Sequence, residues 1–434
     1  MILSLSSAEL ESPLPNADGA PVGHRRWLIC TLVFFATTIN YVDRTVFGLL
    51  APMLQTTIGW NEAQYGYIVT AFQVSYALGL LVMGPLVDRL GSRIGYAIAV
   101  AIWSLSAMAH SLARSVATFV MARFGLGFGE AGNFPSALKT VAEWFPKRER
   151  ALATGIFNSG TNVGATFAPL LVPWIALHLG WQYAFLMTGA FSTIWIVCWW
   201  RIYRRPDEDT KLSAGELAYI RSDPAVAVVK IPWVRLLRHR QTWAFVLGKF
   251  LTDPVWWFFL FWLPKYLSSV HHVTLSGLAL PLIVIYNVAT VGSIFGGWLP
   301  ERYMKAGWTV SRARKTTMLL CAFAVVPVIS AVGMASLWGS VLIISLAVAA
   351  HQGWSCNLLT LPSDMFPTNA VASVVSLGTF AGSLSGAMIA TVAGLLLKAT
   401  GSYLPLFIFA SVTYLCTWCV INFLTPRLQP VAQP

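Results

Sequence analysis

The chain has 434 residues and a formal net charge of +12, with 56% hydrophobic and only 11% charged residues. Soluble proteins carry charge on about a quarter of their residues, so this composition excludes a soluble globular fold and predicts an integral membrane protein. The basic residues lie between apolar runs and form no single stripe or arm, which argues against a nucleic-acid-binding surface. The apolar runs are too long for the strands of a membrane barrel, so an all-α fold is predicted.

Residues 1–26 contain three acids and three prolines but no apolar core. This segment is therefore predicted to be a short cytosolic tail and not a cleavable signal peptide. Twelve apolar runs follow, bounded by charged residues, glycine or proline, and each is long enough to cross the bilayer as a helix. The predicted spans are residues 27–50, 62–87, 94–112, 115–142, 150–177, 180–200, 243–267, 277–303, 314–334, 337–364, 369–397 and 402–425.

One long polar stretch, residues 201–242, separates the first six spans from the last six. It is predicted to be a solvated cytoplasmic linker between a six-helix bundle at residues 27–200 and a second at residues 243–425. Residues 426–434 are predicted to be another cytosolic tail. With both termini in the cytoplasm, 22 of the 29 lysines and arginines fall on cytoplasmic segments. This bias predicts that orientation, because cytoplasmic segments retain Lys and Arg.

The two halves repeat short motifs in nearly constant register, at offsets of 213, 221 and 222 residues. The matching groups are Gly84, Leu86, Asp88 and Arg89 with Gly297, Leu299, Glu301 and Arg302; Glu143, Phe145 and Pro146 with Asp364, Phe366 and Pro367; and Gly160, Gly164 and Ala165 with Gly382, Gly386 and Ala387. Three matches in order indicate an internal duplication. Transporters built from such repeats bind the solute between the halves, near mid-membrane.

The first span holds Asp43 and Arg44 deep within apolar sequence, where a charge costs at least about 2.5 kcal/mol unless a partner compensates it. With Asn40 and Phe47 these residues follow the i, i+3, i+4, i+7 pattern, which predicts one polar face directed at the centre of the molecule. A charge network that ties the first helix to a neighbour is the alternative interpretation.

In the fourth span, Arg123 and Glu130 lie seven residues apart on one predicted face, within a run of glycines that permits a neighbouring backbone to approach closely. An acid in this setting can be protonated by desolvation or kept ionised by an arginine, and proton coupling requires a switch between these states. Lys139 and Glu143, near the cytoplasmic end of the span, are predicted to form a structural i, i+4 pair.

The seventh span carries Lys249 and Asp253 as an i, i+4 pair, and Trp256 continues their face. The alternative is a purely structural ion pair. In the second and fifth spans, Tyr76 and Thr161 are candidate hydroxyl contacts.

Hydrogen-bonding groups are also dense in the tenth span, which contains His351, Trp354, Ser355 and Asn357. An aromatic ring beside amides and hydroxyls suits a sugar ring, which offers a flat apolar face and hydroxyl groups. For His351, a packing role is the alternative.

Arginine suits carboxylate, because its planar fork donates two parallel hydrogen bonds. Two arginines and one lysine deep in the spans therefore favour an anionic organic solute over a cation or a neutral sugar. The acids Asp43, Glu130 and Asp253 can equally balance those charges and leave a neutral site.

Residues 84–93 resemble the signature loop between the second and third helices of the major facilitator superfamily. This resemblance implies the major facilitator fold, with twelve transmembrane helices in two pseudo-symmetric six-helix bundles. It also implies that the loop gates transport by clamping neighbouring helix ends in one conformation and releasing them in the other. The implied gating residues are Gly84, Asp88, Arg89, Gly91 and Arg93.

Longer motifs resemble the anion:cation symporter family, which includes sialic acid and sugar-acid transporters. In the first half they are residues 40–44, 123–135 and 144–146. In the second half, three more motifs are similar to the hexuronate branch of that family, whose members carry glucuronate and galacturonate. These are residues 249–257, 261–267 and 350–357.

The resemblance implies that Arg44 holds the solute carboxylate and that Tyr76 contacts a nearby oxygen. It further implies that Asp43 and Glu130 carry protons, and that Arg123 is the charge that Glu130 releases on protonation. Related carriers have a glutamine ligand where this sequence has Gly160 and Thr161, so their hydroxyl contacts do not transfer directly. The predicted substrate-binding set is completed by Thr161, Lys249, Trp256, His351, Trp354, Ser355 and Asn357, and the proton-coupling set by Asp253.

The sequence therefore predicts a proton-coupled symporter that imports hexuronates across the bacterial inner membrane by alternating access. The alternative solute is another organic anion, such as an aldonate, glucarate, sialic acid or an aromatic carboxylate. We find neither the Ser-His-Asp spacing nor the Cys and His cluster of a membrane enzyme, so no catalytic residue, metal or cofactor is expected beyond the coupling proton. The expected partners are a small anionic sugar acid and the lipid bilayer, with no nucleic acid, and the chain is predicted to be a monomer.

Overall fold

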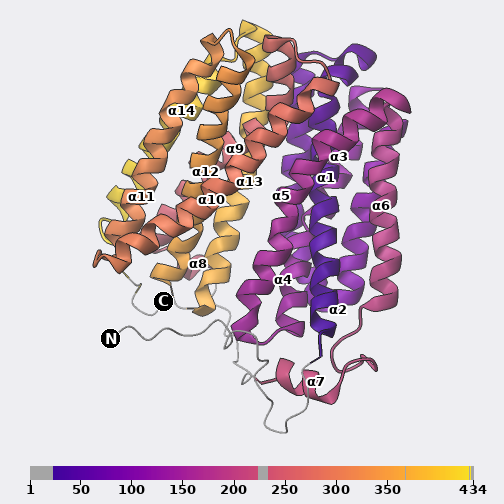
Figure 1. The fold of residues 1–434 in the computed structure, drawn as a ribbon, viewed down its shortest axis with the longest axis vertical. Helices are drawn as coiled ribbons and strands as arrows, with labels where there is room; N and C mark the ends of the chain where they lie inside the picture. The colour runs from indigo at the N-terminus through magenta and orange to yellow at the C-terminus, as the bar shows by residue number, and fades with distance from the viewer. Residues whose placement is uncertain (1–22, 223–232, 367, 430, 432–434) are drawn as a thin grey trace, which may run out of the picture.

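The structure is a computed structural model that describes residues 23–222, 233–366, 368–429 and 431. Parts of the predicted tails and linker, namely residues 1–22, 223–232, 430 and 432–434, lie outside the described residues. The described chain is built from helices and contains no strand, and the long helices lie side by side (Figure 1).

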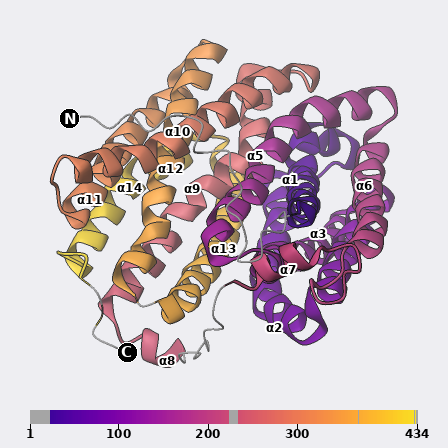
Figure 2. The same ribbon diagram turned by 60° about the horizontal axis from the view of Figure 1, so that its bottom comes forward.

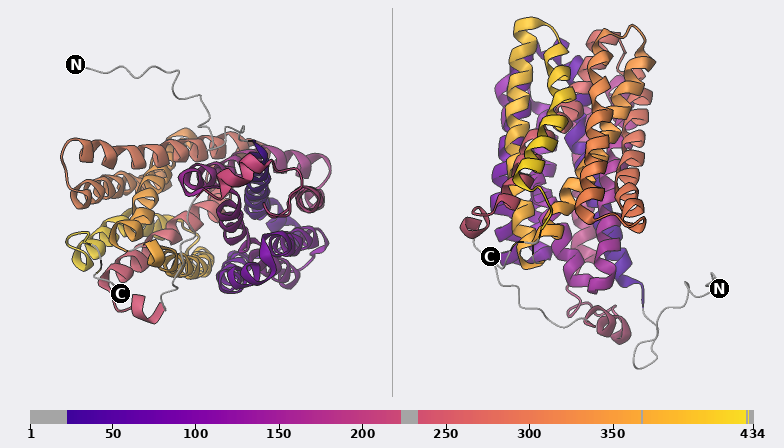
Figure 3. Two further views of the ribbon diagram at one scale, coloured as in Figure 1. Left: turned by 90° about the horizontal axis from the view of Figure 1, so that it is seen from below. Right: turned by 90° about the vertical axis from the view of Figure 1, so that its left-hand side faces the viewer.

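Two groups of long helices are joined by a linker that holds two short helices. The first group consists of α1 (Arg25–Ile58), α2 (Glu62–Ala109), α3 (Val116–Glu130), α4 (Asn133–Trp144), α5 (Lys147–His178) and α6 (Trp181–Ile202). The linker holds α7 (Ala214–Ile220) and α8 (Trp233–Leu236). The second group consists of α9 (Arg240–His271), α10 (Ala279–Lys305), α11 (Val310–Val325) with the 3₁₀ helix η4 (Val326–Gly333), α12 (Leu337–Met365), α13 (Thr368–Thr400) and α14 (Leu404–Leu424). Seen from the α7 end, the two groups occupy opposite halves of the molecule (Figure 3).

α2 crosses the membrane twice. A straight helix of its 48 residues would be about 72 Å long, more than twice the roughly 30 Å hydrocarbon core. Gly91, at φ 78° and ψ 163°, interrupts the helix in a conformation that favours glycine. The chain turns back there so tightly that a Cβ on Gly95 would lie 2.8 Å from the Cα of Val87. The predicted spans 62–87 and 94–112 are the two arms of α2.

Nine helices within the described residues are long and apolar enough to cross a membrane. Counting both arms of α2, and adding α1 and the consecutive helices α3 and α4, gives the twelve predicted crossings. The predicted fourth span is interrupted by a turn at residues 131–132. Pro135 explains this break, since it has no N–H to donate to the carbonyl of Ala131 one turn earlier.

Glycines of α3 and α2 let α3 fit between the two arms of α2. The close approach of a neighbouring backbone to the glycines of α3 is what the sequence predicts. A Cβ on Gly129 would lie 3.0 Å from the carbonyl oxygen of Ala99 on the second arm. On the first arm, a Cβ on Gly79 would lie 2.8 Å from the carbonyl oxygen of Phe128. Larger residues at these positions would push α3 away from the centre of its bundle.

The first part of the predicted solvated linker packs one face against the first bundle, while most of its residues are exposed or half-buried. α7 lies across the end of the first bundle (Figure 2), and Glu216 is only 1% exposed. It accepts hydrogen bonds from the backbone N–H groups of Arg25 and Arg26, at 3.2 and 3.1 Å. The physical reason is that the first N–H groups of α1 have no partner within the helix, and a carboxylate both pairs with them and complements the helix dipole.

Four hydrogen bonds join the two bundles at the end away from α7, which is the predicted periplasmic end. Lys265 of α9 donates to Glu62 of α2 at 2.5 Å, and the Tyr65 hydroxyl donates to the carbonyl of Phe261 at 2.6 Å. One turn deeper, the Thr70 hydroxyl lies 3.2 Å from the Ala387 carbonyl and 2.7 Å from the Thr391 hydroxyl. These contacts close this end of the interface between the bundles.

Candidate functional site

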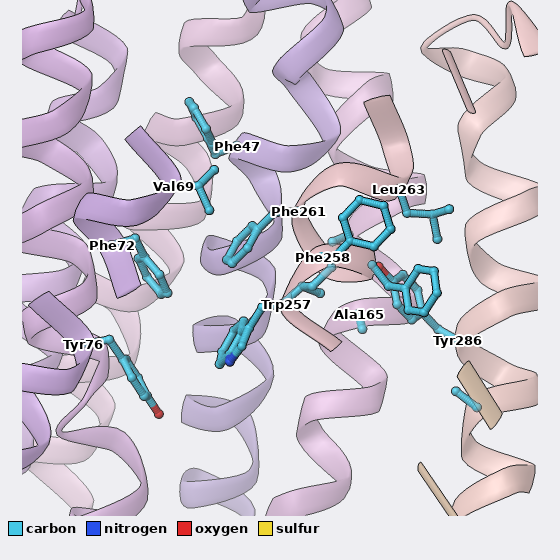
Figure 4. Packing of buried hydrophobic residues seen from close by; sticks show 14 of the residues in the cluster. Phe47, Val69, Phe72, Tyr76, Ala165, Trp257, Phe258, Phe261, Leu263 and Tyr286 are labelled. Atoms are coloured by element: carbon cyan, nitrogen blue, oxygen red, sulfur yellow. The ribbon is translucent and has the colours of Figure 1, made fainter. Parts of the chain in front are cut away.

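Arg44 lies at the centre of the molecule among aromatic rings from both bundles, and its side chain is 2% exposed. The guanidinium carbon is 4.8 Å from the ring of Tyr41 on its own helix. It is 5.4 Å from Phe72 and 4.9 Å from Tyr76 on α2, and 5.7 Å from Trp257 on α9. Figure 4 shows Phe72 and Tyr76 on one side and Trp257 with Phe261 facing them. Such cation–π contacts hold a charged guanidinium in place without neutralising it.

Glu130 of α3 supplies the countercharge. Nε of Arg44 donates to Oε2 of Glu130 at 2.8 Å, while Nη2 makes a longer bond of 3.4 Å to Oδ1 of Asn40. The second carboxylate oxygen of Glu130 has no hydrogen-bond partner among the described residues. The structure therefore brings together Arg44, Tyr76 and Glu130, which the sequence placed on three different spans.

Arg123 does not contact Glu130, although the two residues lie on one helix seven positions apart. Its guanidinium lies over the rings of Phe47 at 4.6 Å, Phe72 at 4.9 Å and Phe261 at 5.6 Å. None of its three nitrogens has a hydrogen-bond partner among the described residues. In place of the expected pairing of Arg123 with Glu130, the structure pairs Glu130 with Arg44 of another helix.

Asp43 points away from this centre, so the prediction that Asp43 and Arg44 share one inward face is wrong. Its Oδ2 accepts a hydrogen bond of 3.0 Å from the Ser192 hydroxyl on α6, and Ser192 in turn accepts one of 3.0 Å from the Trp103 indole. Consecutive residues of a helix are about 100° apart, which is enough to direct one side chain to the bundle centre and the next to α6. Asp43 thereby ties α1 to its own bundle, as the alternative interpretation of these charges holds.

The second bundle contributes a separate charge pair. Nζ of Lys249 and Oδ2 of Asp253, both on α9, are 2.7 Å apart, and the two side chains are 12% and 14% exposed. A Cβ on Gly382 of α13 would collide with the Asp253 carboxylate, so this glycine makes room for the pair. The i, i+4 pair predicted from the sequence is present in the structure.

His351 lies between two aromatic side chains. Its ring stacks on Trp256 with centroids 5.3 Å apart and planes 9° apart, and its Nδ1 is 2.5 Å from the Tyr414 hydroxyl. Trp354 packs edge-on against the same tyrosine, at 5.4 Å. These contacts lie within the second bundle and join α9, α12 and α14.

The remaining predicted contacts engage their own bundle. The amide of Asn357 donates to the carbonyls of Gly296 and Gly353, at 2.7 and 2.9 Å, and so fastens α12 to α10. Thr161 donates to a carbonyl one turn earlier on α5 at 2.8 Å and is half-buried, as is Ser355. Trp354 and Asn357 are almost fully buried, and their ring and amide contacts lie within the second bundle.

In the predicted gating loop, Lys139 of α4 is the residue that holds Asp88. The lysine donates to the Val87 carbonyl at 2.9 Å and to the Asp88 carboxylate at 3.2 Å. It therefore caps the cytoplasmic end of the first arm of α2. The predicted pairing of Lys139 with Glu143 is wrong, since Glu143 instead accepts a hydrogen bond from the Tyr203 hydroxyl.

The arginines of the loop behave differently. Arg93 donates to the carbonyl of Trp200 at 2.9 Å and lies 4.7 Å from that ring, whereas Arg89 is exposed. Gly91 forms the sharp turn described above, and Gly84 has open space where a Cβ would lie.

The sequence predictions did not include Tyr41, Phe72 and Trp257, which form three sides of the aromatic surroundings of Arg44. Helical spacing offered a signal for two of them, since Tyr41 precedes Arg44 by three residues and Phe72 precedes Tyr76 by four. Trp257 had no such signal, because Trp256 next to it continues the face of Lys249 and Asp253. The assignment between the two tryptophans depends on how α9 is rotated in the bundle.

The charges deep in the two bundles balance one another, counting Asp43 and the Lys249–Asp253 pair, which lie outside the centre around Arg44. Three positive side chains, Arg44, Arg123 and Lys249, stand against three acids, Asp43, Glu130 and Asp253. A carboxylate that binds at Arg44 adds one negative charge to this neutral set. Because an uncompensated charge is costly inside the membrane, binding favours the protonation of one of the acids.

Twelve crossings in two bundles, meeting at a buried site of paired charges and aromatic rings, define a membrane transporter for a small solute. The chain belongs to the Major Facilitator Superfamily, whose family model matches residues 33–391. It is 32% identical over 411 residues to the hexuronate transporter of Escherichia coli (strain K12), covering 92% of this chain and 94% of the relative. It is 35% identical over 301 residues to the galacturonate transporter of Dickeya chrysanthemi, covering 68% of this chain and 87% of the relative.

Solved structures share the fold at low sequence identity. A bacterial homologue of the human lysosomal transporter Spinster, in an inward-facing and occupied conformation, has a TM-score of 0.72 at 20% identity, covering 94% of this chain and 96% of that one. A D-xylose-proton symporter has a TM-score of 0.72 at 15% identity, covering 93% and 97%. The predicted fold class and the resemblance to this superfamily are therefore confirmed, and the chain is a multi-pass transporter and not an enzyme.

Proposed function

We propose that this protein is a proton-coupled symporter that imports hexuronates by alternating access. The observation that carries the proposal is the Arg44 guanidinium, which is fixed by four aromatic rings and paired with a single carboxylate from Glu130. A guanidinium held in this way suits a solute carboxylate, and the rings around it offer apolar faces to a sugar ring.

Proton coupling follows from competition for Arg44. A solute carboxylate and the Glu130 carboxylate are both drawn to the same guanidinium, and two adjacent negative charges in a buried site disfavour each other. Protonation of Glu130 removes this competition and keeps the centre neutral when the solute is bound. Arg123, whose guanidinium has no hydrogen-bond partner in the described part of the chain, is the charge that stabilises Glu130 when the carboxylate is ionised again.

Relatives named for their substrates support the choice of solute. The hexuronate and galacturonate transporters described above carry six-carbon sugar acids by name, and a D-galactonate transporter of Escherichia coli O6:H1 is 29% identical over 409 residues. Such solutes combine one carboxylate with several hydroxyls. The alternative is another organic anion, such as an aldonate, glucarate, sialic acid or an aromatic carboxylate.

We further infer that transport occurs across the bacterial inner membrane by a monomer, with both termini in the cytoplasm and two protons moved with each solute. One proton per monovalent acid is electrically neutral and is driven by the pH gradient, at about 1.4 kcal/mol per pH unit. A second proton adds the membrane potential, at about 2.3 kcal/mol per 100 mV. Asp43 and Glu130 are the two buried acids of the first bundle that would carry them.

The test is uptake into proteoliposomes of a panel of labelled acids, with and without an imposed pH gradient. Accumulation of glucuronate or galacturonate that depends on the gradient is the expected result. Preferential uptake of another acid in the panel would move the substrate to the alternative, and uptake insensitive to the gradient would refute proton coupling. An imposed inside-negative potential should stimulate uptake further, and no response would reduce the stoichiometry to one proton.

A further inference from the structure

Gln73 of α2 is a buried amide whose two ends both lack a partner. Its side chain is 0% exposed, and neither Oε1 nor Nε2 has a hydrogen bond among the described residues. Each unpaired buried polar group lowers the free energy of unfolding by about 1–3 kcal/mol. An amide that is unpaired at both its oxygen and its nitrogen is therefore an unusually destabilising side chain for a buried position.

Helical spacing places this amide at the contact between the two bundles. Gly66, Thr70 and Gln73 follow the i, i+4, i+7 pattern on one face of α2. The first two meet α13, since a Cβ on Gly66 would lie 3.2 Å from the Cα of Gly394 and Thr70 bonds to Thr391 at 2.7 Å. The two helices run in opposite directions, so Gln73 lies one turn deeper, level with residues 383–387 of α13.

This level is also that of the central arginine. Gln73 lies between Phe72 and Tyr76 in the chain, and both of those rings contact Arg44. On the opposite bundle, Trp257 packs where a Cβ on Gly386 would lie and is the fourth ring around Arg44. The amide of Gln73 is therefore within about one helical turn of the residues that surround the guanidinium.

We propose that Gln73 is a specificity-determining residue whose amide binds the hydroxyl groups of the solute held at Arg44. This inference rests on the proposed function. An amide offers one acceptor and two donors, and the adjacent hydroxyls of a sugar acid can donate to the carbonyl and accept from the NH₂ at the same time. Thr70, the neighbouring polar group on the same face, has its hydroxyl bonded to protein atoms, whereas Gln73 keeps its hydrogen-bonding capacity for the solute.

The experiment is a binding cycle on the purified full-length protein, with glucuronate and its single-deoxy analogues measured by titration calorimetry. Gln73→Met removes the amide at nearly the same length, and Gln73→Leu serves as a second apolar variant with a separate chance of folding well. We expect the Kd for glucuronate to rise roughly 3- to 10-fold in the variants, the value of one neutral hydrogen bond. At least one deoxy analogue should bind the wild type weakly but lose that penalty in the variants.

Thr70→Val is the matched control, because it removes a polar group from the same face of α2 without touching the amide. It should leave the pattern of preferences among the deoxy analogues unchanged. Wild-type affinity in both Gln73 variants would overturn the inference, as would a uniform loss for glucuronate and every analogue, which indicates support of the site and not contact with a hydroxyl. If the wild type binds no hexuronate, the proposed function fails instead, and the same cycle with the acid identified by the uptake panel then decides the role of Gln73.

Discussion

Arg44 on α1 and Glu130 on α3 are 86 residues apart in the chain and form an ion pair of 2.8 Å, with side chains 2% and 0% exposed. Removing one partner of a buried pair leaves an uncompensated charge and costs about 3–5 kcal/mol. In the proposed function, a solute carboxylate that takes the place of Glu130 therefore arrives together with a proton for the displaced acid. On that proposal, the same contact connects solute binding to proton uptake.

Replacement of Arg44 by lysine tests the need for the guanidinium fork. Arg44→Lys keeps the positive charge but cannot donate parallel hydrogen bonds to a carboxylate or span the distance between Glu130 and the aromatic rings. We expect the Kd for the acid to rise about 10- to 100-fold, corresponding to one charge-assisted hydrogen bond. Titration calorimetry on purified protein measures this directly.

Arg312→Lys is the matched control for that variant, because Arg312 also lies over an indole ring, at 4.1 Å from Trp308, but near the start of α11. It should bind the acid as the wild type does. Equal affinity in Arg44→Lys and in the wild type would remove Arg44 from the binding site.

Replacement of Glu130 by glutamine mimics its protonated state. Glu130→Gln retains an oxygen that accepts from Nε of Arg44 but no longer competes as a charge for the guanidinium. Exchange of labelled for unlabelled solute across the membrane should continue, whereas accumulation driven by a pH gradient should be lost. Glu208→Gln removes an exposed carboxylate from the linker and should accumulate solute normally. Normal accumulation by Glu130→Gln would refute its role as proton carrier.

The spans and the two-bundle fold could be predicted because they depend on the length of apolar runs, which the bilayer fixes directly. Even the double crossing of α2 was visible in the charged residues around Gly91. The residues of the centre could also be found, because Arg44, Arg123 and Glu130 are charges in places where the bilayer opposes charge.

The pairing of those charges could not be read from the sequence. Arg123 and Glu130 share a helix, yet Glu130 pairs with Arg44 of another helix, and Asp43 next to Arg44 turns to Ser192. A rotation of one helix by a single residue, about 100°, decides between these arrangements, and it depends on how all the neighbours pack. The linker helix is a similar case, since the buried position of Glu216 depends on the N–H groups of α1, almost two hundred residues away.

The ion pair between Glu62 and Lys265 is expected to keep the predicted periplasmic end closed. The lysine is 4% exposed and lies 4.7 Å from the ring of Tyr65. Lys265→Met removes the pair, whose contribution is on the order of 1 kcal/mol, and should favour the open form about fivefold. Labelling of Ala390→Cys by an impermeant maleimide, in a background without the native cysteines, reports this opening.

The charge swap Glu62→Lys with Lys265→Glu provides the control for that effect. It restores an ion pair with reversed polarity at the same place, so the labelling rate should return towards the value of the unmodified pair. A labelling rate in Lys265→Met equal to that of the parent protein would show that Glu62 and Lys265 do not hold this end closed.

The carboxylate of Glu216 is expected to stabilise the first bundle from the linker. It accepts from two backbone N–H groups at the start of α1 and from the Arg26 guanidinium at 3.1 Å. In the Glu216→Ala variant, Arg26 would still pair with a second carboxylate, that of Glu149, at 2.9 Å. The substitution should therefore lower the free energy of unfolding by about 1–2 kcal/mol, which is less than the loss expected when a buried charge is left without any partner. Thermal unfolding in detergent, followed by tryptophan fluorescence, should show a Tm lower by a few degrees.

Glu208→Ala is the control, because it removes an exposed carboxylate from the same linker and should leave the Tm unchanged. Equal Tm values for the two variants would mean that α7 rests on the bundle without stabilising it.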